Sequence, residues 1–285
     1  MHSPIRQITP EAFPFLLTEI PDCPKTLYIQ GNLPDPELIP LAVIGSRRMS
    51  AYGKRVCEQL VEGLRGYPIV IVSGLALGLD SVAHEAALKV GIPTVAVLPS
   101  GLGRGVIYPA IHRELAKRIV EKGGALISEY EENEKPREWS FSARNRIVAG
   151  MSQAVLVIEA AERSGTSITT RLALDYNRDV LAVPHPLQSE TGAGTNTLIR
   201  GGATLIRSCA DILEALNIEA QTEVTMDVAA LSPDEKIIFE CLYEPCERGD
   251  IPTRANLPAQ RVNVALSMLI IKGILREEMG KVVRN

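Results

Sequence analysis

The sequence has few of the side chains that cross-link a protein or hold a metal ion. Its five cysteines are scattered without a Cys-x-x-Cys pair, and its four histidines show no ligand spacing. This pattern argues against a disulfide framework and against a zinc cluster, so we expect reduced thiols, no bound metal and no cofactor. The cysteines are Cys23, Cys57, Cys209, Cys241 and Cys246.

Long apolar runs are also absent. No segment approaches the ~18 apolar residues that a membrane span requires, and the first residues lack the charged and then apolar pattern of a secretory signal. We therefore expect a cytoplasmic protein without a membrane segment. The net charge of −4, from 30 basic and 34 acidic residues, does not indicate a polyanionic partner, so any such partner must be argued from local residues.

The 285 residues do contain a repeated alternation of short β-branched runs and longer amphipathic segments. This alternation is typical of α/β proteins in which helices connect the strands of a parallel sheet, and continuous apolar runs indicate strands buried on both faces. We predict six or seven parallel strands, including those at 41–44, 69–72, 94–98, 125–127, 154–158 and 180–183. Helices are predicted between them at 51–65, 79–90, 111–122, 143–152 and 167–177.

These patterns divide the chain into four parts. Residues 1–40 form a proline-rich lead that is too short for a core of its own, and we expect it to wrap around the sheet domain of residues 41–216. Residues 217–229 have the polar composition of a linker. In residues 230–285, an N-cap signal, helical patterns and a strand-turn-strand pattern predict a small winged helix.

Small and hydroxyl-bearing residues follow several predicted strands, at residues 45–48, 73–74 and 164–166. Ligands of open parallel sheets bind outside the carboxyl ends of the strands, which is where these residues lie. Backbone N–H groups of such turns, and of the helix that follows, can bind a phosphate, with Arg47 supplying charge. Tight packing also selects small residues at turns, but their repetition along one edge favours an anion site.

A second indication is the segment 139–146, in which Trp139 and Phe141 stand beside Arg144 and Arg146. Single-stranded nucleic acid requires such a combination, because bases stack on aromatic faces and phosphates pair with guanidinium groups. The alternative interpretation is a solvated helix start with Phe141 in the core.

Catalytic arrangements find little support. Asp80 and His84 fall on one face of a predicted helix and could form a triad with Ser73 or Ser128, but no Gly-x-Ser-x-Gly elbow is present. A helical histidine near an aspartate is more often a structural group. The sequence also lacks a phosphate-binding P-loop and a Gly-x-Gly-x-x-Gly turn after the first strand, which argues against a P-loop ATPase and an NAD enzyme. We therefore assign no catalytic residue.

Several motifs occur in a fixed order along the chain: Leu27-Tyr28-Ile29-Gln30-Gly31-Asn32, Gly45-Ser46-Arg47, Ser73-Gly74, Gly78-Leu79-Asp80, Tyr108-Pro109, Ser128-Glu129-Tyr130, Arg144-Asn145-Arg146, Ser164-Gly165-Thr166 and Gly194-Thr195-Asn196. Over about residues 24–215 this series resembles the DprA/Smf family. The resemblance implies an extended Rossmann-like fold followed by a winged helix. It also implies a homodimer that binds single-stranded DNA without sequence preference and delivers it to the RecA recombinase in natural transformation, without catalysing a reaction.

The resemblance assigns roles to individual positions. Arg47, Arg144 and Arg146 would bind phosphates, and Phe141 would offer its face to a base. The candidate DNA-binding residues are Gly45, Ser46, Arg47, Arg48, Ser73, Gly74, Phe141, Arg144, Asn145, Arg146, Ser164, Gly165, Thr166 and Thr169.

Three positions depart from the family pattern. Leu77 stands where an arginine is common, His112 where an asparagine is common, and Ser142 where a proline is common. The missing arginine should weaken DNA binding and reduce its salt dependence by about one phosphate contact.

Two other functions remain open. The Ser-Gly-Thr turn at 164–166 also resembles nucleotide phosphoribohydrolases of the same superfold, but their glutamate falls on Thr169, so the group for glycosidic cleavage is missing. A sequence-reading transcription factor is disfavoured because residues 229–285 carry eight basic and eight acidic side chains without a basic stripe. A protein contact or weak duplex binding suits that part better.

Overall fold

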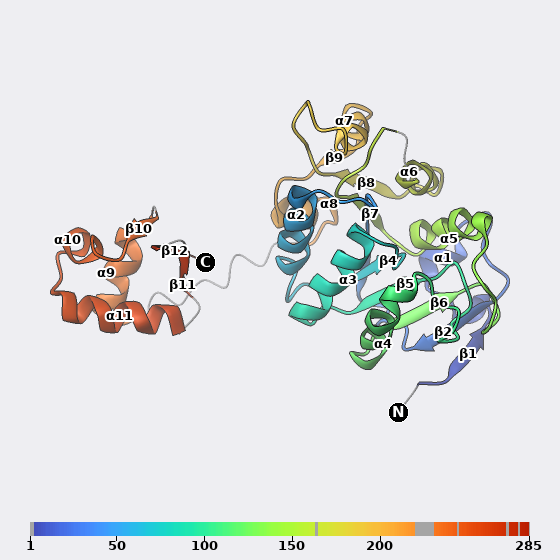
Figure 1. Ribbon diagram of the computed structural model, residues 1–285, viewed down its shortest axis with the longest axis horizontal. Coiled ribbons are helices and arrows are strands. Elements are labelled where there is room, and N and C mark those ends of the chain that lie inside the picture. The colour runs from blue at the N-terminus through green and yellow to red at the C-terminus, as the bar shows by residue number, and fades with distance from the viewer. Residues whose placement is uncertain are drawn as a thin grey trace. The chain divides into compact units, whose positions relative to one another are not determined.

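The structure is a computed structural model that describes residues 3–162, 165–219, 231–243, 245–271, 274–278 and 280–284. It divides into two compact units, Met1–Glu219 and Ala220–Asn285, each with its own hydrophobic core. The division falls inside the segment predicted to be a linker. Figure 1 shows both units, which are described separately below.

The first unit is built on a nine-stranded sheet of described residues in the order β1-β2-β6-β5-β4-β3-β7-β8-β9. The neighbouring strands β6, β5, β4, β3, β7, β8 and β9 are parallel to one another, as predicted. Strand β2 pairs antiparallel with β6, and β1 pairs antiparallel with β2. The strands are β1 (Ile5–Ile8), β2 (Leu27–Gly31), β3 (Ile39–Ile44), β4 (Ile69–Ser73), β5 (Thr94–Val97), β6 (Ala125–Ser128), β7 (Ala154–Val157), β8 (Asp179–Ala182) and β9 (Thr204–Leu205).

The proline-rich lead therefore does more than wrap the domain, since it supplies two strands of the sheet. In β2, residues Leu27, Ile29 and Gly31 are buried and alternate with half-buried residues, which is the pattern of a strand close to a sheet edge. The prolines lie outside both strands, where they cannot interrupt the hydrogen bonds between strands.

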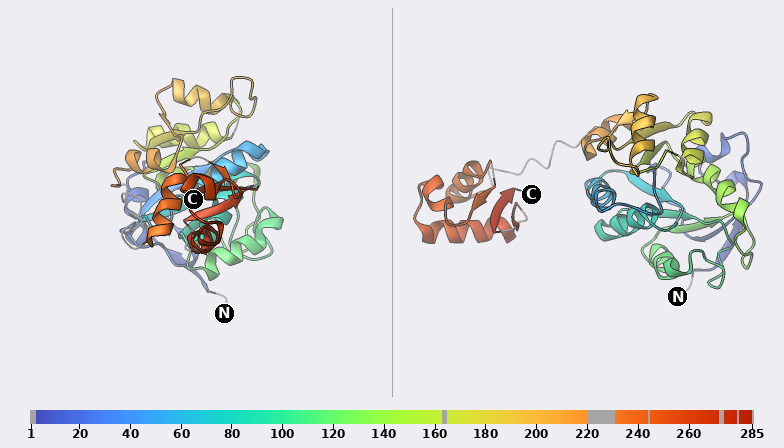
Figure 2. Two further views of the ribbon diagram at one scale, coloured as in Figure 1. Left: turned by 90° about the vertical axis from the view of Figure 1, so that its left-hand side faces the viewer. Right: turned by 45° about the horizontal axis from the view of Figure 1, so that its top comes forward.

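Helices cover both faces of the sheet (Figure 2). One face packs mainly against α2, α3, α4 and α8, and the other against α1, α5 and α6. This arrangement is possible because successive residues of the buried strands point to opposite faces and are apolar on both. The helices are α1 (Phe15–Thr18), α2 (Ala51–Glu62), α3 (Leu79–Val90), α4 (Arg113–Glu121), α5 (Glu138–Gly150), α6 (Thr166–Asp175), α7 (Ala193–Arg200) and α8 (Cys209–Ala215), with short 3-10 turns η1 (Pro10–Ala12) and η2 (Ala110–His112).

Helix α5 begins at Glu138, five residues before the predicted start at Ala143. Its first turn is held by Ser140, whose Oγ accepts a hydrogen bond from the Arg137 N–H at 3.0 Å and donates one to the Arg137 carbonyl at 2.7 Å. As a result Phe141 lies within the helix, one turn before Arg144 and Asn145.

The second unit contains α9 (Pro233–Cys241), β10 (Cys246–Glu247), α10 (Ile251–Ala255), α11 (Ala259–Ile271), β11 (Leu275–Glu278) and β12 (Lys281–Arg284). Its described strands form an antiparallel sheet in the order β10-β12-β11. The predicted N-cap is present, because Ser232 Oγ accepts from the Glu235 N–H and Glu235 Oε2 accepts from the Ser232 N–H. Helices followed by a hairpin, in this order, are compatible with the predicted winged helix.

Candidate functional site

A crevice of about 380 Å³ opens beyond the carboxyl ends of β3 and β7. After β3 the chain adds β4, β5 and β6 along one edge of β3, and it then returns to add β7, β8 and β9 along the other edge. The strand order therefore reverses at β3. Open α/β sheets bind their ligands at this point. The crevice is lined by Ile44, Gly45, Ser46, Arg47, Ala76, Asp80, Phe141, Ser142, Arg144, Asn145, Ala161, Gly165, Thr166, Ile168 and Thr169.

Arg47 supplies an available positive charge to this crevice. It is exposed in the loop after β3, and it forms no ion pair with any carboxylate in the described part of the chain. Its guanidinium carbon lies over the Phe141 ring at 5.4 Å from the ring centre. The contact holds the charge above an aromatic face while leaving its N–H donors free for an anion.

The start of α2, in contrast, is already occupied by protein groups. Ser50 Oγ accepts from the Gly53 N–H at 2.9 Å, and Ser50 in turn donates its N–H and hydroxyl to Glu159 Oε2 at 3.0 and 3.1 Å. Glu159 is completely buried beside this helix end, where the helix dipole favours a carboxylate. The expected phosphate cradle at the start of α2 therefore holds an internal carboxylate instead.

The start of α6, unlike that of α2, lines the crevice. Gly165 stands at its N-cap without a side-chain hydrogen bond, and Thr166, Ile168 and Thr169 line the crevice. The exposed N–H groups and positive end of such a helix are suited to an anion. Ser164, predicted to belong to the same turn, lies outside the described residues.

Arg144 lies at the floor of the crevice and is only 5% exposed. It donates to the carbonyls of Gly74 and Val97, the latter at 2.5 Å, and to Asn145 Oδ1 at 3.1 Å. A Cβ atom on Gly74 would lie 1.9 Å from Arg144 Nη1, so only glycine leaves room for the guanidinium there.

Burial lowers the pKa of Arg144 and raises the pKa of the nearby Asp80. The negative charge of Asp80 raises the Arg144 pKa in part, and the positive charge of Arg144 lowers the Asp80 pKa in part. Asp80 Oδ2 also accepts from the N–H groups of Gly74 and Ala76, at 3.1 and 3.4 Å. The two side chains thus fix the loop after β4 from both sides.

Arg146 points away from the crevice. Its Nη2 bonds both oxygens of Glu129 at 2.5 and 2.6 Å, and its Nε lies 3.7 Å from Asp22. Because two carboxylates already balance its charge, this guanidinium has little left to offer a phosphate. Arg48 and Ser73 also do not line the crevice, and Ser73 Oγ is committed to the Val43 carbonyl at 2.6 Å.

Phe141 connects the crevice to a smaller pocket that includes Gly74 and Leu77. Its ring meets Tyr108 edge to face, with the ring centres 5.4 Å apart. Tyr108 and Leu77 are 46% and 45% exposed, so an apolar rim with two aromatic rings faces the solvent. In the sequence Tyr108 stands out only as half of a Tyr-Pro motif, and no role was predicted for it. Its position after a long loop gives no periodic signal that could reveal the contact.

Asp80 and His84 do not form part of a triad. His84 Nδ1 lies 2.7 Å from Thr94 Oγ1, whose own hydrogen is donated to the Ile71 carbonyl, so Nδ1 carries the proton. Burial lowers the pKa of His84 to about 3. The histidine is therefore a neutral structural group, as the sequence suggested.

Within the described part of the chain, no group of three His, Cys, Asp or Glu side chains could hold a metal ion. In the same residues, no helix is both long and apolar enough to span a membrane.

The fold and the crevice together define an α/β protein with a largely parallel sheet and a cationic, partly aromatic crevice at its switch point. Residues 5–217 match the family model of DNA recombination-mediator protein A, and the chain belongs to that family. This confirms the resemblance found in the sequence.

Named relatives agree with this assignment. The chain is 42% identical over 206 residues to protein Smf of Escherichia coli, covering 72% of this chain and 54% of that protein. It is 40% identical over 210 residues to the DNA processing protein DprA of Streptococcus pneumoniae, covering 74% and 73%. The chain thus spans about half the length of the first relative and nearly three quarters of the second.

Two solved structures share the fold. The DNA processing protein A of Streptococcus pneumoniae is 37% identical with a TM-score of 0.68, covering 74% of each chain. The Helicobacter pylori protein, whose structure was described for its unique single-stranded DNA binding mode, is 33% identical with a TM-score of 0.65. That comparison covers 76% of this chain and 98% of the other.

Proposed function

We propose that the crevice binds single-stranded DNA without sequence preference. One observation carries the proposal: Arg47, without an ion pair in the described residues, lies over Phe141 at the mouth of a crevice that the start of α6 also lines. Arg47 and the α6 N–H groups would bind phosphates, while Phe141 and Tyr108 would offer faces to bases. Arg144 would act from the floor by fixing the loops that carry these groups.

The relatives support this proposal, because the Helicobacter pylori protein with the same fold binds single-stranded DNA. Binding through phosphates and base faces is independent of sequence, because every nucleotide offers both. A preference for single strands follows from the aromatic face, since bases in a duplex are already stacked.

The test is fluorescence anisotropy of a labelled single-stranded oligonucleotide, alongside a duplex of the same sequence, at low and moderate salt. The proposal predicts tight binding of the single strand that weakens with salt. Equal binding of both forms, or none at low salt, would contradict it.

We further propose that the protein acts as a homodimer in the cytoplasm and helps to load the RecA recombinase on the bound strand. The family of recombination mediators supports a role beside a recombinase. The corresponding measurement is the DNA-dependent ATPase of RecA on strands coated with a single-strand binding protein, in which the protein should shorten the lag.

A nucleotide phosphoribohydrolase is the second candidate. Thr169 lines the crevice at the position where those enzymes carry a glutamate. Asp80 is the carboxylate among the described lining residues, and it is committed to two backbone N–H groups. With no free acid or base among these lining residues, cleavage of a mononucleotide is not expected, and detecting it would favour the enzyme instead.

For the second unit we propose a protein contact rather than duplex reading. Arg261 on α11 pairs with Asp234, its Nε lying 2.8 Å from Oδ2, which leaves less positive charge for DNA. The apolar side chains of Ile237, Val264 and Met268 are 40%, 65% and 43% exposed. Exposed aliphatic groups on packed helices are suited to a protein partner.

A further inference from the structure

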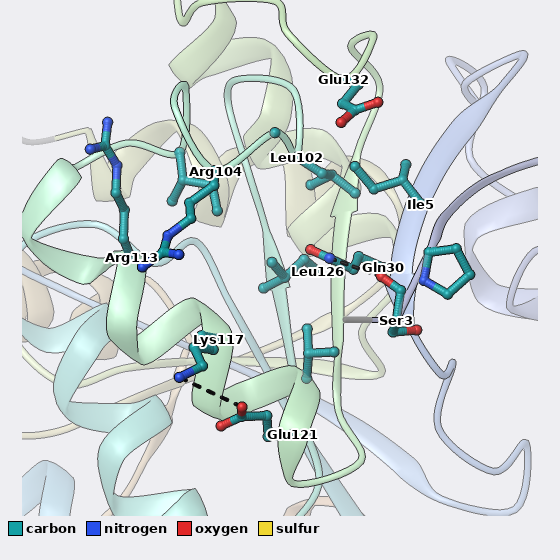
Figure 3. A pocket seen from close by; sticks show the side chains of 14 residues that line it. Ser3, Ile5, Gln30, Leu102, Arg104, Arg113, Lys117, Glu121, Leu126 and Glu132 are labelled. Carbon is teal, nitrogen blue, oxygen red and sulfur yellow. Dashed lines mark hydrogen bonds and ion pairs between the residues drawn. The ribbon is translucent and has the colours of Figure 1, made fainter. Parts of the chain in front are cut away.

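A second groove of about 370 Å³ lies in the first unit and shares no lining residue with the crevice described above. Figure 3 shows it from close by. It is bounded by α4, by the loop of residues 102–107, and by β1, β2 and β6. We call it the α4 groove.

The floor of the α4 groove is a row of side chains across neighbouring strands. Ile5 pairs in register with Gln30, which pairs with Leu126. Leu102 and Ile107 from the loop lie beneath this row and are buried. Leu102, Ile107 and Leu126 are buried beneath α4, so the aliphatic surface that the groove offers comes from the exposed Pro4 and the half-buried Ile5 and Val120.

One wall of the α4 groove is cationic. Arg113 and Lys117 lie one turn apart on α4, and Arg104 comes from the loop that precedes it. The side chain of Arg113 is held in place because its Nη2 donates to the Gly105 carbonyl at 2.7 Å. Its Nε is buried and has no hydrogen-bond partner among the described residues. Arg104 forms no hydrogen bond or ion pair with the described part of the chain, so its charge is available.

The same lining does not suit a nucleic acid. Three cations face two carboxylates, Glu121 and Glu132. Lys117 already pairs with Glu114 at 3.5 Å and with Glu121 at 3.7 Å, so the available positive charge is that of Arg104 and Arg113. None of the described lining residues is aromatic, so no base could stack there. A small excess of positive charge over an aliphatic floor instead complements a carboxylate beside an aliphatic side chain.

We propose that the α4 groove binds an acidic and aliphatic peptide segment of a partner protein. A leucine-like side chain would pack against Pro4, Ile5 and Val120, and neighbouring carboxylates would pair with Arg104 and Arg113. Because the groove and the crevice share no residue, the protein can hold a peptide and a DNA strand at the same time. This inference does not depend on DNA binding in the crevice.

The test uses the full chain and a fluorescein-labelled peptide, Glu-Asp-Leu-Asp-Leu-Leu, followed by fluorescence polarisation at low salt. Arg104→Glu should weaken peptide binding roughly tenfold or more, because a charge at a protein interface is reversed. Arg104 is exposed on a loop, so this variant should keep its fold. The matched control is Arg65→Glu, an exposed position outside both sites, which should leave peptide binding unchanged.

A second peptide in which serine replaces each leucine should bind weakly or not at all, because it cannot pack against the aliphatic surface. Arg104→Glu should leave the affinity for single-stranded oligothymidine unchanged. The proposal is overturned if the first peptide does not bind at roughly millimolar concentration, or if Arg65→Glu weakens it as much as Arg104→Glu. It is also overturned if oligothymidine displaces the peptide, since the groove would then extend the DNA path.

Discussion

At the scale of single residues, the arginines of the first unit differ in what already binds their donors. Arg47 has no carboxylate partner among the described residues, Arg144 is buried against two carbonyls, and Arg146 is paired with Glu129 and Asp22. A ligand can use a guanidinium only to the extent that its donors are free. The three side chains should therefore respond very differently to truncation.

Arg47→Ala should weaken binding of every single-stranded sequence to a similar extent. It should also reduce the slope of log affinity against log salt by about 0.7, since one phosphate contact is lost. Arg48→Ala is the matched control, because Arg48 is an exposed neighbour that does not line the crevice. If Arg47→Ala binds like the wild type at all salt concentrations, the crevice is not the DNA site.

Arg144→Ala should act mainly on stability. Its removal takes away the stronger of the two arginine charges that act on the buried Asp80, the other being Arg47, and leaves two buried carbonyls without this donor. The free energy of unfolding should therefore fall by about 3–5 kcal/mol. Urea denaturation would measure this. Arg146→Ala removes ion pairs with Glu129 and Asp22 but leaves both carboxylates in contact with solvent, so it should cost less, about 1–2 kcal/mol. Equal losses in the two variants would contradict the assigned roles.

His84 should make stability depend on pH. Its pKa is about 3 in the folded chain, against 6.5 in an unfolded one. Between these two pH values the imidazole is protonated in the unfolded chain and neutral in the folded chain. The contribution to stability is complete above pH 6.5 and is lost as the pH falls toward 3. The expected slope is about 1.4 kcal/mol per pH unit.

Denaturant titrations between neutral pH and about pH 4.5 would measure this slope. His84→Asn retains a donor toward Thr94 but no longer titrates. Its stability should therefore fall less steeply with decreasing pH than that of the wild type. An unchanged slope would show that other groups cause the pH dependence.

At the scale of elements, α5 brings an aromatic face and a buried cation to the same crevice. Phe141→Ala should lose about 1–3 kcal/mol of binding free energy toward single strands, which is the value of one stacked base. Trp139→Ala is the control, because Trp139 is 55% exposed on the same helix but outside the crevice. Anisotropy titrations of both variants would test this, and a larger loss for Trp139→Ala would place the stacking elsewhere.

The sequence was sufficient to predict the buried strands because their apolar runs are continuous. It was not sufficient for β1 and β2, since short strands among prolines lack such runs, nor for the first turn of α5, which depends on Ser140 bonding back to Arg137. Arg47, Phe141 and Gly165, which the sequence singled out as candidate site residues, line one crevice in the structure. The sequence could not show that Glu159 would occupy the start of α2, because that contact joins residues 109 positions apart.

At the scale of the whole molecule, the crevice and the family match both lie within the first unit. A chain ending at residue 219 should therefore bind single-stranded DNA within about twofold of the full chain, since each unit has its own core. Gel filtration and circular dichroism should first establish that the fragment is folded. A folded fragment that no longer binds would show that the second unit takes part in DNA binding.

The pairing of early strands with late ones also determines when the first unit can complete its sheet during synthesis. Strand β2 ends at residue 31, but its partner β6 begins at residue 125, and β3 pairs with β7 from residue 154. At a ribosomal rate of roughly 5–20 residues per second, one edge of β2 and one edge of β3 wait several seconds before these partners exist. During this interval their unpaired edges can associate with other nascent chains, so we expect the yield of folded protein to depend on chaperones and on the speed of translation.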